Sequence, residues 1–125
     1  MAAGYTRIAN GTTYSAANGF GWLGGSIQSR DRGAATGDDL QRDFNYTSLG
    51  TFVVDVPEDG LYEVTLVMGD GLGYVRDQMG IILEGVLVDT VTADGQTYAV
   101  VTYRTPVNDG QLTITFDDLG GTRPW

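Results

Sequence analysis

The sequence predicts an all-β protein, an antiparallel β-sandwich of the jelly-roll type. Asp-Gly pairs at residues 59–60, 94–95 and 109–110 each precede a run in which apolar and polar residues alternate. Aspartate and glycine favour tight turns, and such alternation suits strands with one buried face. Six or seven short strands at these intervals indicate a sandwich, and no segment of useful length has the period of a helix.

The first fifty residues are rich in Gly, Ser, Thr, Asn and Asp, which favour loops and turns. They predict a short strand within residues 5–14 and a long loop over 18–37. A short strand or turn is expected at 40–46. A loop as long as the second of these segments is usually functional or packed on its own side chains.

From residue 51 the alternation becomes regular. Strands over 51–56 and 61–68 are expected to form a hairpin around Pro57–Gly60. The later elements are, in order, a glycine-rich loop over 69–77, strands over 79–83 and 86–91 with a turn at Glu84 and Gly85, and strands over 96–103 and 111–116 separated by a loop with Pro106. The side chains expected in one sandwich interior are Phe52, Val54, Tyr62, Val64, Leu66, Leu112, Ile114 and Phe116.

The composition excludes several classes of function. The net charge is −9, from 16 acidic residues against seven arginines, and the chain has no histidine, cysteine or lysine. An acidic protein repels nucleic acids and anionic membranes, so neither is expected as a partner. The usual catalytic bases and nucleophiles are missing, and no carboxylate pair stands at a defined separation, so the chain is not expected to be an enzyme.

The length suits one domain, residues 1–125. Met1–Gly4 lacks the charged and apolar regions of a signal peptide. We expect a single β-sandwich module cut from a longer protein.

Several motifs point to a known family. They are Gly19-Phe20-Gly21-Trp22, Arg30-Asp31-Arg32, Leu40-Gln41-Arg42-Asp43-Phe44, and Thr51-Phe52-Val53-Val54-Asp55-Val56-Pro57. The chain resembles a galactose-binding-like, malectin-like jelly-roll module of the kind that accompanies rhamnogalacturonan-active esterases and lyases and recurs in large exported bacterial proteins. The resemblance implies a non-catalytic accessory module that binds an extracellular polysaccharide.

The chain departs from that family at both ends. The family usually begins with a Phe-Asp-Phe-Gly-like strand and closes with an apolar strand after the region that corresponds to residues 119–121, and neither is present. We therefore expect the sandwich to lack one or both terminal strands and to expose sheet edges.

Sugars are bound by aromatic faces together with carboxylate, amide or guanidinium groups. The predicted loops supply these groups at Trp22, Tyr46, Tyr74, Arg76 and Asp77. The alternative is that Trp22 and Tyr46 cap the core. The sequences Arg30-Asp31-Arg32 and Arg42-Asp43 have two interpretations. Their guanidinium groups contact a ligand, or they form ion pairs with carboxylates that brace the long loop.

A structural calcium ion is a further expectation, since such ions are common among the lectin-like sandwiches that the chain resembles. Calcium needs six to eight oxygen ligands. The candidate ligands are Asp38, Asp39, Asp70, Asp117 and Asp118, and solvated turn aspartates are the alternative.

Two other functions remain open. The module is a structural or adhesive spacer without a sugar ligand, or it is a strand acceptor that pairs with a complementing β-strand peptide or with another copy of itself.

Overall fold

The computed structural model describes residues 4–33, 43–70, 74–93 and 98–120. None of these residues belongs to a helix with the length and hydrophobicity that a membrane span requires. The strands in the described ranges are β1 (Phe20–Gly25), β2 (Gln28–Asp31), β3 (Asp43–Tyr46), β4 (Leu49–Asp55), β5 (Gly60–Met68), β6 (Arg76–Leu83), β7 (Val86–Ala93), β8 (Ala99–Val107) and β9 (Gln111–Asp118).

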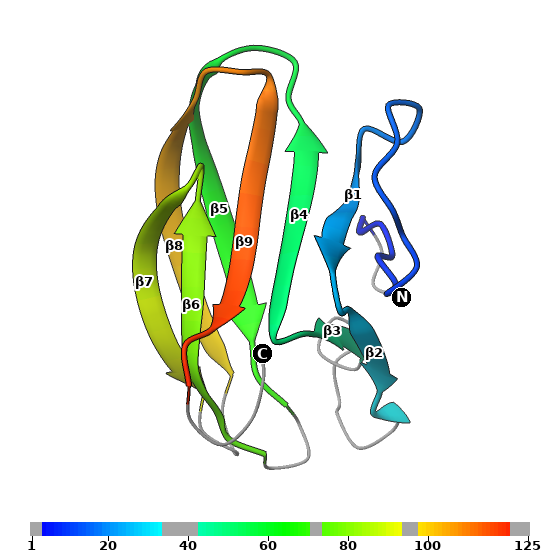
Figure 1. The fold of residues 1–125 in the computed structure, drawn as a ribbon, viewed down its shortest axis with the longest axis vertical. Helices are drawn as coiled ribbons and strands as arrows, with labels where there is room; N and C mark the ends of the chain where they lie inside the picture. Colours follow the sequence, from blue (N-terminus) through cyan, green and yellow to red (C-terminus); the bar gives the residue numbers. More distant parts are fainter. Residues whose placement is uncertain (1–3, 34–42, 71–73, 94–97, 121–125) are drawn as a thin grey trace.

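Five strands form one antiparallel sheet in the order β1-β4-β9-β6-β7, and β5 pairs with β8 in a second sheet. The strands β2 and β3 form a separate short ribbon. In Figure 1 the β5–β8 pair lies behind the five-stranded sheet, and the ribbon lies at the lower end of the molecule, below β1. The fold is an antiparallel β-sandwich, as the sequence predicts.

Apolar side chains from both sheets fill the space between them. Ile81 at the centre of β6 is fully buried, and Met79 and Leu83 lie on the same face of that strand with 1% exposure each. Val64 and Met68 of β5 meet them from the second sheet. Of the predicted interior residues, the structure buries Val64, Leu112 and Ile114 in this cluster and packs Val54, Tyr62, Leu66 and Phe116 against it half-buried.

The hairpin of β6 and β7 confirms the predicted turn at Glu84 and Gly85. Both turn residues have positive φ, +50° and +80°. Two such residues make the type I′ turn that matches the twist of a two-residue hairpin, and the glycine adopts it without steric cost.

The predicted hairpin of strands 51–56 and 61–68 is wrong. In the structure β4 pairs with β1 and β9, whereas β5 pairs with β8. The turn at Pro57–Gly60 therefore carries the chain from one sheet to the other. Alternation shows which face of a strand is apolar, but two strands that face each other across a core alternate in the same way as two that pair.

Two predictions for the first third of the chain are also wrong. The expected loop over 18–37 contains β1 and β2, and residues 5–14, all described, contain no strand. Within that stretch Thr13 forms only an isolated bridge with Trp22. Three of the six residues in β1 are glycine, so its pairing with β4, rather than β-propensity, holds it in a sheet.

The loop predicted around Pro106 is shorter than expected. Pro106 lies within β8, opposite Leu61. In the described residues β8 pairs only with β5, so it is an edge strand, where a residue without an N–H is tolerated.

The chain before β1 covers part of the outer face of the large sheet. Gly21 pairs with Val53, so the two positions share a face, and Val53 is fully buried although it lies outside the core cluster. A Cβ atom on Gly21 would lie 2.3 Å from the backbone nitrogen of Tyr14. The backbone at Tyr14 therefore rests directly on Gly21 and covers this face.

Replacing Gly21 by alanine should lower the free energy of unfolding by more than about 1 kcal/mol, because the new Cβ meets backbone and φ is +145°. Gly24→Ala in the same strand is the matched control, since a Cβ there has no neighbour within 4 Å. Urea denaturation of both variants measures the difference. Equal losses would show that the contact at Tyr14 does not constrain β1.

Candidate functional site

The β2–β3 ribbon presents two aromatic rings on one face. Gln28 pairs with Tyr46, and Arg30 pairs with Phe44, so these four side chains point to the same side of the ribbon. The rings of Phe44 and Tyr46 are 6.2 Å apart between centroids, and the Tyr46 hydroxyl donates a hydrogen bond to Gln28 Oε1.

A buried carboxylate joins this ribbon to the sandwich. Asp70, two residues after β5, accepts two hydrogen bonds from Arg32, at 3.0 Å from Nε and 2.6 Å from one terminal nitrogen. Arg76 at the start of β6 donates a third, at 2.8 Å. The side chain of Asp70 is fully buried, and those of Arg32 and Arg76 are 16% and 9% exposed. The hydrogen bond to Asp70 raises the pKa of Arg32, so its guanidinium stays charged.

The guanidinium groups in turn lie over aromatic rings. Arg32 lies 5.5 Å from the centroid of Phe44 and 5.6 Å from that of Tyr74. Arg76 lies 5.7 Å from both ribbon rings, and Arg30 lies 5.5 Å from that of Tyr46. These distances are within the range of cation–π attraction. We call this set the arginine–aromatic cluster: Arg30, Arg32, Phe44, Tyr46, Asp70, Tyr74 and Arg76.

The structure brings three of the five predicted sugar-binding residues, Tyr46, Tyr74 and Arg76, into the cluster. Tyr74 is 39% exposed, whereas Arg76 is 7% exposed. Asp77 follows Arg76 on β6 and is half-buried. Trp22 lies apart, and its ring contacts those of Phe52 and Phe116 on the inner face of the large sheet.

Sequence reasoning missed Phe44 and the role of Asp70 in the cluster. The alternation of polar and aromatic residues at 43–46 is a usable signal for Phe44, because it places both rings of β3 on one face. No local pattern indicates that Asp70 pairs with Arg32, which is 38 positions away. For Arg32 the structure shows the Arg–carboxylate bracing that was one of the two interpretations.

The structure describes three of the five candidate calcium ligands, Asp70, Asp117 and Asp118. Asp70 is paired with two arginines, and Asp118 accepts a hydrogen bond from the backbone of Gly120. Asp117 is half-buried on β9, and Asp38 and Asp39 lie outside the described residues. Across the described ranges no group of three or more acidic side chains is arranged to hold a metal ion.

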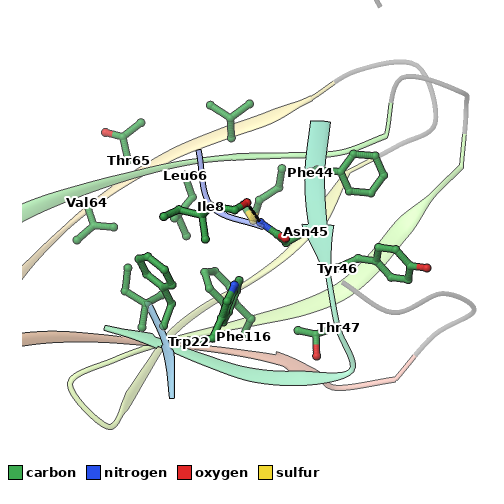
Figure 2. A pocket seen from close by; sticks show the side chains of 14 residues that line it. Ile8, Trp22, Phe44, Asn45, Tyr46, Thr47, Val64, Thr65, Leu66 and Phe116 are labelled. Atoms are coloured by element: carbon green, nitrogen blue, oxygen red, sulfur yellow. Dashed lines mark hydrogen bonds between the residues drawn. The ribbon is translucent and has the colours of Figure 1, made fainter. Parts of the chain in front are cut away.

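A cavity of about 340 Å³ lies next to the cluster, on the inner face of the large sheet and beside β5. Phe44 and Tyr46 border it, and its floor includes Trp22, which makes edge contacts with Phe52 at 5.2 Å and Phe116 at 6.0 Å. The lining is mainly apolar. Figure 2 shows these side chains arranged around the space.

Comparisons with known proteins agree with this architecture. Residues 1–120 match the family model for the beta-agarase/YXIM esterase-like, galactose-binding domain-like region. The chain is 36% identical over 126 residues to beta-agarase A of Zobellia galactanivorans, an alignment that covers 98% of this chain and 22% of that protein.

The fold is also similar to the crystal structure of the protein YXIM from Bacillus subtilis. The TM-score is 0.70 at 24% sequence identity, over 95% of this chain and 37% of that one. The chain therefore spans well under half the length of either protein. It belongs to the beta-agarase/YXIM esterase-like, galactose-binding domain-like family.

Proposed function

We propose that this domain is a non-catalytic module that binds an extracellular polysaccharide through the arginine–aromatic cluster. The observation that carries the proposal is the exposed ring of Tyr74, held beside the guanidinium of Arg32, which is itself fixed by buried Asp70. Family membership supports it, because the family is described as galactose-binding-like.

The cluster has the chemistry that a sugar requires. An aromatic face covers the C–H surface of a pyranose ring, and guanidinium groups donate hydrogen bonds to hydroxyl or carboxylate oxygens. Arg30 is exposed on β2, and Gln28 on the same face adds an amide. Since Asp70 and the stacked rings already hold the guanidinium groups, little side-chain entropy remains to be lost on binding.

The same composition argues against catalysis by this chain. It contains no histidine, cysteine or lysine that would serve as base or nucleophile. The match to 22% of beta-agarase A is consistent with an accessory part of a larger enzyme. We assign the module to the outside of the cell, where polysaccharides of this kind occur.

Replacing Tyr74 by alanine should weaken binding to the recognised polysaccharide by roughly 1–3 kcal/mol, about five- to 150-fold, because the exposed stacking ring is lost. Isothermal titration against a panel of neutral, sulfated and uronic-acid polysaccharides, agarose oligosaccharides included, measures the change. Tyr74→Phe keeps the ring and should bind nearly as tightly as wild type.

Leu87→Ala provides the control. Leu87 is 53% exposed on the β6–β7 hairpin, outside the cluster, so its loss should leave affinity unchanged. Equal affinity of Tyr74→Ala and wild type would show that the sugar does not bind at Tyr74 and that the site lies elsewhere on the domain. Absence of binding to every glycan would favour the structural spacer.

A further inference from the structure

Among the described residues, β5 has a strand on one edge only. All nine residues of β5 pair with β8, from Gly60 opposite Val107 to Met68 opposite Ala99. In the part of the chain that the structure describes, no strand and no backbone hydrogen bond lies on the other edge. An unpaired edge is a template for another strand.

The cavity of about 340 Å³ runs beside this edge. Val64, Leu66 and Met68, which point inward from β5, line it, and so do Thr65 and Val67, which point outward. Because side chains from both faces of β5 line the cavity, the cavity lies beside the edge of this strand and not over one of its faces. On the other side Ile8, Phe44 and Asn45 form a wall, in which the Asn45 side-chain amide donates to the Ile8 carbonyl oxygen at 2.8 Å.

The floor of this slot is the inner face of the large sheet where β5 does not cover it. It contains the rings of Trp22, Phe52 and Phe116. The Trp22 ring nitrogen is buried, and its N–H has no acceptor among the described residues. Figure 2 shows that nitrogen on the side of the indole that faces Ile8 and Asn45. A buried donor without an acceptor is costly, so an incoming chain that brought carbonyl oxygens would be favoured here.

We propose that the slot accepts one extended strand of a partner polypeptide. Its backbone pairs with the free edge of β5 and enlarges the two-stranded sheet to three strands. Its alternate apolar side chains enter the cavity above Trp22, Phe52 and Phe116, and its other side chains face solvent. Affinity comes from the main-chain hydrogen bonds, and specificity comes from the alternating apolar positions.

The geometry favours a single strand over a second copy of the domain. The wall of Ile8, Phe44 and Asn45 lines the slot opposite β5, so it obstructs a whole sheet edge more than it obstructs one extended chain. The net charge of −9 also opposes self-association and favours a strand with basic residues at its solvent-facing positions. A small apolar molecule would fill the cavity but leave the β5 backbone unpaired.

The test uses a fluorescent nine-residue peptide, matching the length of β5, with valine or isoleucine at alternate positions and lysine or threonine between them. Fluorescence anisotropy should show saturable binding. The same peptide with N-methylated amides on alternate residues keeps its side chains but loses one edge of donors, so its affinity should fall by at least about tenfold.

Thr65 and Thr102 provide a matched pair of protein variants. Their hydroxyls hydrogen-bond to each other at 2.9 Å across β5 and β8, but only Thr65 borders the slot. Thr65→Trp should block the peptide, and Thr102→Trp, which breaks the same hydrogen bond, should leave its affinity unchanged. Equal binding of the parent and N-methylated peptides, equal effects of the two variants, or no peptide binding would each overturn the proposal. So would a dimer in light scattering that Thr65→Trp abolishes, because the occupant would then be a second copy.

Discussion

Asp70→Asn should lower the free energy of unfolding by about 3–5 kcal/mol, the range for removing one partner of a buried ion pair. The single carboxylate of Asp70 compensates two guanidinium groups, those of Arg32 and Arg76. Asparagine keeps the shape of the side chain but not its charge. Arg76, with a side chain only 9% exposed, would then lose the charge of the carboxylate that it contacts at 2.8 Å.

Chemical denaturation followed by circular dichroism measures the effect of this substitution. Glu63→Gln is the matched control, since it removes a carboxylate whose ion pair with Arg104 is 3.7 Å long and exposed to solvent. Exposed pairs contribute about 0–1 kcal/mol, so the control should be nearly as stable as wild type. If Asp70→Asn lowered the free energy of unfolding as little as the control does, the cluster would not hold the β2–β3 ribbon against the sandwich. Asp70 would then not preorganise the guanidinium groups for sugar binding either.

Ile81→Ala should cost about 2–5 kcal/mol of stability, from lost burial and from the cavity that remains. Ile81 has no exposed surface, and β6 is paired on both sides, with β7 and β9, so the surroundings have little freedom to collapse into the space. The loss should appear as a lower denaturation midpoint with an unchanged slope.

Leu87→Ala is the control: it truncates a side chain of similar size on the neighbouring strand, β7, but at an exposed position. Leu87 is 53% exposed, so the change should stay within about 0.5 kcal/mol. A larger loss for Leu87→Ala than for Ile81→Ala would mean that the assigned faces of the β6–β7 hairpin are inverted, since a shift of one residue exchanges every inward and outward side chain.

The sequence by itself determined the fold class and most of the strands in the second half of the chain. Turn residues and regular alternation locate β4 to β7 and β9 and assign the inward faces of β4, β5 and β9, because turn geometry and the period of two are local properties. It also supplied the residue types of the candidate site, and three of the predicted residues, Tyr46, Tyr74 and Arg76, do lie in one cluster.

Only the tertiary structure decided which strands pair. The turn after β4 crosses to the other sheet, and the glycine-rich β1 is a strand because β4 offers it a partner. The arginine–aromatic cluster likewise depends on contacts such as that of Arg32 with Asp70, 38 positions apart. Local patterns constrain the backbone and the buried face of each segment, but the partner of a strand or of a charge is set by free energies summed over the whole packed chain.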